Sequence, residues 1–216
     1  MTPTDVRDVR AAHLGATLRA DARRNRARVL DAARAAFAER GLEAQMDEIA
    51  RAAGVGVGTV YRHFETKEAL LEAVALEPLG ELIERCRAAL EEEDAGAALE
   101  SFLRWSVEKQ VNDRCIAESS LGSVASSPTL VDARAELGAA AAELLAKAQA
   151  AGAVRADLVM EDLPMLVFGI GAVQRVDPCM PVTTWRRHLE IVLDGIRAPG
   201  TASLPPFEPL PGAPAS

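Results

Sequence analysis

Apolar residues recur along most of this chain at the three- and four-residue spacing of amphipathic helices. The first such helix is expected over residues 22–40, because Val29, Ala33 and Phe37 share one face and Gly41 follows the last turn. Similar patterns continue to the region around Ile196, and together they predict about nine helices and no sheet. The sequence therefore indicates an all-α fold.

Residues that favour helix ends separate these patterns. Thr66 is suited to cap a long helix carrying Leu70 and Val74, and Pro78 is expected to kink that helix or end it early, since proline lacks an N–H donor. Further helix starts are marked by Asp94, by Ser127 before a proline, by Glu161 with Asp162, and by Thr184. Six of the 19 residues from 198 to 216 are proline, so this tail is expected not to pack.

The stretch Met46–Phe64 has the pattern of two short helices joined by a tight turn. Ile49 and Ala53 place apolar or small side chains on one face of the first helix, and Gly54 suits the left-handed backbone that ends it. The second helix directs Val60 inward and carries polar and aromatic residues that packing alone does not require. This arrangement is typical of a helix-turn-helix motif, whose second helix enters the major groove of DNA.

Three glycines in the same stretch also allow a second interpretation. Gly54, Gly56 and Gly58 superficially resemble a phosphate-binding loop, which requires a preceding strand and a following helix. A helical pattern precedes Gly54, so the helix-turn-helix interpretation is favoured.

The net charge of the chain is −8, yet its two parts differ in sign. Residues 1–70 hold 12 basic and 10 acidic residues, a balance of +2, and the remaining 146 hold 12 and 22, a balance of −10. Five arginines, at positions 19, 23, 24, 26 and 28, lie within ten residues and only Asp21 opposes them. Such a patch suits phosphate contact, although each arginine alone also fits a solvated helix start.

At this point the segment Arg23–Val74 resembles the N-terminal domain of TetR-family transcriptional repressors. The features that carry the resemblance are Phe37 and Gly41 closing the first helix, Ile49-Ala50, the Gly54–Gly58 turn, Tyr61–Phe64, and Lys67-Glu68 before Leu70-Leu71. The resemblance covers about a quarter of the chain, and the remainder matches in helical layout only.

The resemblance implies a set of DNA contacts in the N-terminal part. The candidates are Arg23, Arg24, Arg26, Gly56, Thr59, Tyr61, Arg62, His63 and Lys67. Tyr61 and Lys67 match positions that contact phosphates, and Thr59, Arg62 and His63 match positions near base edges or neighbouring phosphates. Gly56 and Val57 depart from the polar or basic residues common in relatives, which leaves more of the base reading to Thr59 and Arg62.

The resemblance also implies an organisation into four segments. We expect a flexible basic arm at residues 1–20, a helix-turn-helix domain at 21–66, a helical effector-binding and dimerisation domain at 67–197, and a disordered tail at 198–216.

In the family, the last two long helices pair with those of a second copy. Gly169 and Ala172 would permit close approach, while Trp185, Leu189 and Leu193 would fill the seam of the homodimer. Helical periodicity alone leaves open the alternative that these residues face the core of their own subunit.

An effector pocket is a further implication, and large side chains suited to line it are Phe102, Trp105, Met165 and Phe168. Gln110 and Glu118 would orient a bound molecule if they face inward. The expected effector is a small apolar or amphipathic compound. Each aromatic residue also fits plain core packing.

Other chemistry is sparse in this sequence. Cys86, Cys115 and Cys179 lack metal-binding spacing and are expected to be reduced thiols, with redox sensing as an alternative for any one of them. The three histidines fit neither zinc-site nor catalytic spacing, so no catalytic residue, metal or cofactor is expected, and an enzyme is disfavoured. No signal peptide or membrane span is indicated, which predicts a cytoplasmic protein.

The sequence thus predicts a dimeric repressor that binds a palindromic operator in double-stranded DNA and responds to a small molecule. Two alternatives remain at this stage: a TetR-like DNA binder without an effector, and a helical dimeric interaction protein that has lost DNA binding. Activation in place of repression is also left open.

Overall fold

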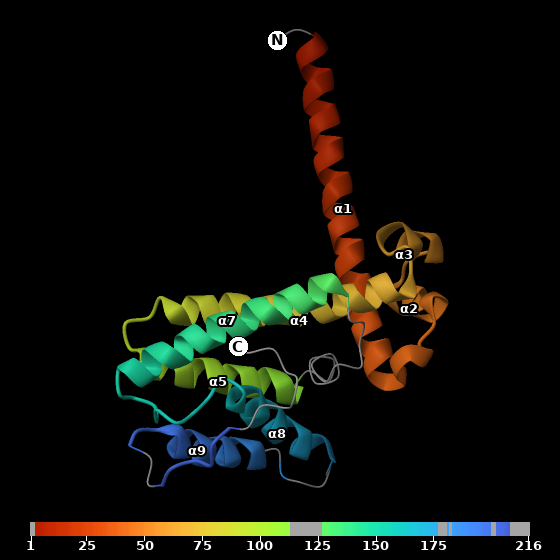
Figure 1. Cartoon of the computed structure of the whole chain (residues 1–216). Helices are drawn as coiled ribbons and strands as arrows, with labels where there is room; N and C mark the ends of the chain where they lie inside the picture. Colours follow the sequence, from red (N-terminus) through yellow and green to blue (C-terminus); the bar gives the residue numbers. More distant parts are fainter. Residues whose placement is uncertain (1–2, 113–126, 177–180, 182, 200–201, 208–216) are drawn as a thin grey trace.

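The computed structural model describes residues 3–112, 127–176, 181, 183–199 and 202–207, and these are almost entirely helical (Figure 1). The elements are α1 (Pro3–Arg40), a 3-10 turn (Gly41–Glu43), α2 (Met46–Ala53), α3 (Val57–His63), α4 (Lys67–Leu90), α5 (Ala95–Asn112), α7 (Pro128–Ala150), α8 (Asp162–Val176) and α9 (Thr184–Ile196). The all-α prediction is confirmed. None of the described helices is long and apolar enough to cross a membrane.

Glycines with positive φ end α1 and α2, and the second of them begins the turn between α2 and α3. Gly41 ends α1 with φ of 54°, and Gly54 ends α2 with φ of 65°, where a side chain would be strained. The N–H of Val55 then donates to the carbonyl of Ala50 at 3.0 Å and closes the turn. At the start of α2, the N–H of Gln45 donates to the carboxylate of Glu48 at 3.3 Å, which is the glutamate half of a capping box.

The side chains form two separate hydrophobic cores. The first lies among α1, α2, α3 and the start of α4, with Ile49 and Val60 fully buried. The second lies among the later helices and includes Leu144 and Leu193. Helix α4 contributes to both, because its first turns carry Leu70, Leu71 and Val74 and its last turns carry Cys86 and Ala89. In the second part α4 packs along α7 and α5, while α8 packs on α5 and α9.

Three predicted helix caps are confirmed by hydrogen bonds. The Thr66 hydroxyl accepts from the Ala69 N–H at 3.0 Å, Asp94 accepts from the Ala97 N–H at 2.9 Å, and Ser127 accepts from the Leu130 N–H at 3.2 Å. Each satisfies a backbone donor that the first helical turn leaves without a partner. The cap expected at Thr184 is wrong by one position, because Thr183 precedes the helix and its side chain forms no cap hydrogen bond.

Two further expectations about helices are corrected. Helix α1 begins at Pro3, so the part of the expected flexible arm from residue 3 onward is helical. No proline occurs between Pro3 and Gly41, and the abundance of alanine and arginine favours continuation of the helix. Of the two outcomes expected at Pro78, an early end of α4 is wrong, because the helix continues to Leu90. The packing of α4 against α5 and α7 outweighs the loss of one backbone hydrogen bond.

The described residues 202–207 of the proline-rich tail are all exposed, yet two of them form hydrogen bonds to the rest of the chain. Arg155 binds the Asp157 carboxylate, with Nη2 2.9 Å from Oδ2, and also donates to the carbonyl of Ala202. Asp157 in turn accepts from the N–H of Leu204 at 2.8 Å, and these hydrogen bonds lower its pKa below the usual range. Residues 202–207 thus stay outside both hydrophobic cores but are held at two points, whereas 208–216 lie outside the described residues.

Cys86 is fully buried in the second core. Burial, together with the negative charge of Glu143, raises the pKa of its thiol to about 11. The thiolate is therefore disfavoured at neutral pH, and a buried thiol that stays protonated is unsuited to redox sensing. Cys115 and Cys179 lie outside the described residues.

We expect Cys86 in the native protein to resist alkylation. Iodoacetamide at pH 8 should leave the Cys86 peptide unmodified in the folded chain and modify it in guanidinium chloride, because the thiolate forms only after unfolding. Peptide mass spectrometry measures both states. Labelling of native Cys86 at the rate of a free cysteine would contradict the burial argument.

Candidate nucleic-acid interface and ligand cavity

The outer face of α3 combines polar and apolar side chains. Val60 is fully buried and anchors the helix to the first core. Tyr61 is 48% and Val57 42% exposed, and Arg62 is also exposed, so these three side chains face outward. Thr59 and His63 are half-buried. A solvent-facing tyrosine and arginine on a short helix after a tight turn match the geometry of a recognition helix.

An arginine of α1 that was not among the predicted site residues holds the turn before α3. The Nη2 of Arg28 donates to the carbonyl of Gly54 at 3.3 Å. A Cβ added at Gly54 would lie 2.5 Å from the same nitrogen, so a side chain there would displace the Arg28 guanidinium from this hydrogen bond, while the positive φ is what favours glycine. Arg28 and Gly54 are 26 positions apart, and no local sequence pattern signals their contact.

The other arginines of this cluster differ in their surroundings. The guanidinium of Arg26 lies over the ring of Phe64, 5.3 Å from its centroid, which brings this part of α1 next to the end of α3. Arg23 and Arg24 are exposed, and Arg24 pairs with Asp21.

The remaining candidates, Gly56 and Lys67, flank α3. Gly56 is the exposed residue before α3, and Lys67 is the half-buried first residue of α4, beside the Thr66 cap. The predicted candidates thus lie on α1, on and beside α3, and at the start of α4.

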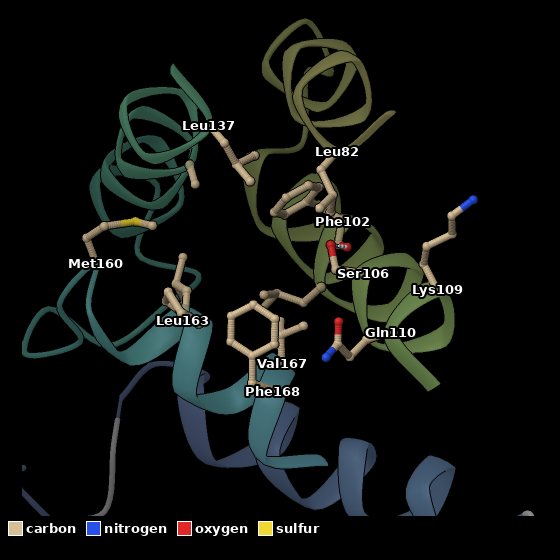
Figure 2. A pocket seen from close by; sticks show the side chains of 13 residues that line it. Leu82, Phe102, Ser106, Lys109, Gln110, Leu137, Met160, Leu163, Val167 and Phe168 are labelled. Carbon is tan, nitrogen blue, oxygen red and sulfur yellow. Dashed lines mark hydrogen bonds between the residues drawn. The ribbon is translucent and has the colours of Figure 1, made fainter. Parts of the chain in front are cut away.

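A cavity of about 110 Å³ lies among α4, α5, α7 and α8 (Figure 2). Its wall is almost wholly apolar and includes Leu82, Phe102, Leu137, Leu163 and Phe168. A neighbouring cavity of about 290 Å³ shares Leu82, Leu137, Met160, Pro164 and Phe168 with the first. The second cavity also reaches Ala75, Pro78 and Leu79 of α4.

Polar groups of the first cavity come from one side of α5. Gln110 is 1% exposed, and neither its amide nitrogen nor its amide oxygen has a hydrogen-bond partner in the described part of the chain. Ser106, one turn earlier, donates to the carbonyl of Phe102 at 2.8 Å. The ammonium of Lys109 points away from the cavity in Figure 2 and lies 2.5 Å from the carboxylate of Glu81.

The structure separates the predicted pocket residues into two groups. Phe102, Gln110 and Phe168 line the cavity. Trp105 does not; it is half-buried, with its ring centroid 6.0 Å from the Lys109 ammonium. Met165 is also outside the cavity, since it is 73% exposed on the opposite face of α8. Glu118 lies outside the described residues.

The predicted dimer-interface residues are divided in a similar way. Trp185, Leu189 and Leu193 are buried in the core of their own chain, with exposed fractions of 6%, 4% and 0%. They are not available to a second copy, because α9 turns its apolar face toward α5 and α8. Gly169 is exposed and Ala172 is half-buried on α8.

Comparison with known proteins agrees with this architecture. Residues 29–74 match the family described as bacterial regulatory proteins, tetR family, and residues 94–198 match the C-terminal domain of SbtR-like transcriptional regulators. The HTH-type transcriptional regulator UidR of Escherichia coli is 36% identical over 75 residues, which are 34% of this chain and 38% of UidR. The chain thus spans less than half the length of this curated relative.

Solved structures match over most of the chain. A TetR transcription regulatory protein from Mycobacterium vanbaalenii is 40% identical, with 83% of this chain and 99% of that protein covered and a TM-score of 0.60. A TetR transcriptional regulator from Streptomyces coelicolor is 33% identical, with coverages of 82% and 99% and a TM-score of 0.58. These relatives are transcriptional regulators and not enzymes, as the sequence predicted. The chain belongs to the TetR family of transcriptional regulators.

Proposed function

We propose that this chain is a homodimeric repressor that binds a palindromic operator and is released when a small apolar or amphipathic molecule enters the cavity beside α5. The observation that carries the proposal is the position of α4. This helix begins directly after the helix-turn-helix and lines both cavities, with Leu82 in the smaller one and a row from Ala75 to Leu82 in the larger one. A molecule that changes the position of α4 therefore also changes the position of α3, because the first turns of α4 pack in the same core as α3.

The exposed side of α3 supports the DNA-binding part of the proposal. Arg62 has the geometry to donate two hydrogen bonds to a guanine, and Val57 offers an apolar contact to a thymine methyl group. Tyr61 and Lys67 contact phosphates on either side of the groove. Thr59 and His63 are half-buried and therefore less accessible to DNA than Tyr61 and Arg62. They contact DNA only at the edge of this surface.

The outer surfaces of α8 and α9 support the homodimer. Met165 is 73% and Ile191 59% exposed, and both are large apolar side chains. Gly169 and Gly195, each four residues further along the same helix, are also exposed, and a Cβ added at either would meet nothing within 4 Å. Apolar side chains beside small residues suit close packing against a second copy. Two-fold pairing then presents two copies of α3 to two half-sites.

An ion pair links the cavity region to the DNA-binding part. Glu77 of α4 accepts a hydrogen bond from Arg34 of α1 at 2.7 Å. Its neighbour Pro78 lines the second cavity. Ligand binding that shifts this turn of α4 would alter the contact with α1, and coupling of about 1–3 kcal/mol is typical of such regulators. The ligand must favour the conformation that does not bind DNA, because equal affinity for both conformations shifts nothing.

A repressor of this kind acts where the chromosome lies, so the proposal includes a cytoplasmic location. A constitutive DNA binder would not need the unpaired buried amide of Gln110 in an apolar cavity. An interaction protein without DNA binding would not need outward-facing Tyr61 and Arg62 after the helix-turn-helix. Both alternatives are therefore disfavoured.

Variants of α3 and the start of α4 test the DNA contact. On DNA selected by the protein from a random pool, Tyr61→Ala and Lys67→Ala should weaken binding to all sequences alike, and Lys67→Ala should lower the salt slope by about one. Arg62→Ala should relax preference at one base position at a cost of roughly 1–3 kcal/mol. Fluorescence anisotropy measures both effects. Lys147→Ala on α7 is the control, and unchanged affinity in the Tyr61/Lys67 double variant would disprove the docking.

Replacement of Met165 and Ile191 by glutamate tests the dimer. The double variant should be a folded monomer with greatly reduced operator affinity, because the charges lie on an exposed surface and oppose pairing without entering the core. Light scattering and circular dichroism check mass and fold. Val131→Glu, at a residue of α7 that is 52% exposed, should remain dimeric. A stable monomer for the unmodified chain would refute the dimer.

A double-mutant cycle on Arg34 and Glu77 tests their coupling to DNA binding. Arg34→Ala and Glu77→Ala should each change operator affinity, and the combined variant should deviate from additivity by about 1 kcal/mol, as expected for a partly exposed ion pair. The control pair is Arg87 with Glu136, whose ion pair joins α4 to α7 within the second part of the chain. Its loss should leave operator affinity unchanged. Additive effects at Arg34 and Glu77 would exclude the ion pair as a link.

A further inference from the structure

The cavity beside α5 has a polar feature that restricts what it can bind. We propose that its ligand is an uncharged, mainly apolar molecule with one group that both donates and accepts hydrogen bonds, such as a hydroxyl or an amide, and that this group binds Gln110. The inference rests on the proposed ligand-binding role and specifies the chemical class.

The amide of Gln110 carries the argument. The side chain is 1% exposed, and both its Nε2 and its Oε1 lack a partner in the described part of the chain. A buried amide without partners is costly, because it has given up hydrogen bonds to water and gained none in return. Figure 2 shows Gln110 extending from α5 toward Val167 and Phe168 of α8, at the cavity. A ligand group with a donor and an acceptor satisfies both atoms at once.

Ser106 supports the same chemistry. It precedes Gln110 by one helical turn and lines the same cavity. Its hydroxyl proton is engaged, because Oγ donates to the Phe102 carbonyl at 2.8 Å. Its oxygen still has lone pairs that accept a hydrogen bond. The two side chains therefore provide one donor and two acceptors at a single place on the wall.

The charges around the cavity argue against an ionised ligand. Lys109 is the one ionisable residue in the described lining of the smaller cavity, and its ammonium lies 2.5 Å from the Glu81 carboxylate. It points away from the cavity in Figure 2. A carboxylate or ammonium beside Gln110 would lose its hydration without gaining a free counter-charge, which is strongly unfavourable.

The volume of the cavity limits the size of the apolar part of the ligand. Its volume of about 110 Å³ suits a single ring or a short aliphatic group, since engineered cavities of ~150 Å³ bind benzene. The shared residues Leu137, Met160 and Phe168 border both this cavity and the larger one, which reaches Pro78 and Arg134, so a longer ligand extends toward Pro78 by moving one of these shared side chains. A ligand anchored at Gln110 thus reaches the turn of α4 that pairs with α1.

Four small probes of similar size test the proposal: benzyl alcohol, ethylbenzene, benzylamine and benzoate. Ligand-observed NMR titration measures each dissociation constant for the full-length protein and for Gln110→Leu, which conserves volume and removes the amide. In the unmodified protein, benzyl alcohol and ethylbenzene should bind measurably and the two charged probes should not. In Gln110→Leu, benzyl alcohol should weaken about tenfold relative to ethylbenzene, because its hydroxyl loses its partner.

Two controls separate this effect from general damage. Leu103→Met, also on the cavity wall, should change the affinities for the two neutral probes by the same factor. Gln110→Leu should keep its helical circular dichroism and unfold at an equal or higher temperature, since an unpaired amide is removed from the interior. A fall in the unfolding temperature would indicate that Gln110 serves the fold and would overturn the proposal.

The remaining outcomes distinguish the ligand class from the repressor function. An unchanged ratio of benzyl alcohol to ethylbenzene affinity in Gln110→Leu would overturn the assignment to Gln110, as would tight binding of benzoate or benzylamine. Operator affinity, measured in the same samples without probe, reports on the proposed function independently. If the probes follow the expected order and DNA binding is absent, the ligand class stands and the repressor proposal fails.

Discussion

The rest of the structure depends on the sharing of α4 between two hydrophobic cores. Its first turns are buried with α1, α2 and α3, and its last turns are buried with α5 and α7. Each core fixes the helix through side chains that cannot leave it without exposing apolar surface. A rigid helix held at both ends transmits displacement, so packing changes in one core affect the orientation of elements in the other. The same buried residues of α4 that stabilise the two cores therefore also couple the positions of the helices in one core to those in the other.

The Arg34–Glu77 ion pair lies between these two sets of buried residues. Neither partner is fully buried, with exposed side-chain fractions of 27% and 46%, so the pair contributes modestly to stability. Its value lies in geometry, because it joins α1 to the turn of α4 that borders the larger cavity. A weak contact at this place is easily remade in a second arrangement, whereas the packed cores on either side resist change.

How much the sequence could predict depended on the range of each interaction. Gly54, Thr66, Asp94 and Ser127 act within four residues of themselves, and their roles followed from helix-cap chemistry. The contact of Arg28 with Gly54 spans 26 positions and depends on how α1 packs, which no local pattern encodes. The buried state of Leu193 was equally hidden, because an apolar stripe has the same period whether it faces its own core or a partner. The hydrogen bonds of Arg155 and Asp157 to residues 202 and 204 were hidden for a related reason, because each joins positions that lie 47 apart in the sequence.

Gln110 illustrates why a pocket is harder to infer than a fold. An apolar residue at this position would extend the packing of Leu103 and Val107 along α5 and remove an unpaired amide from the interior. Folding alone therefore gives no reason for glutamine here, and sequence periodicity cannot tell whether a polar residue in such a stripe faces solvent or a cavity. Only the three-dimensional arrangement shows that the amide is enclosed with Phe102 and Phe168. A local departure from good packing, located beside a cavity and on a helix that packs against α4, is what a binding site requires, because a ligand gains affinity by satisfying groups that the protein leaves unsatisfied.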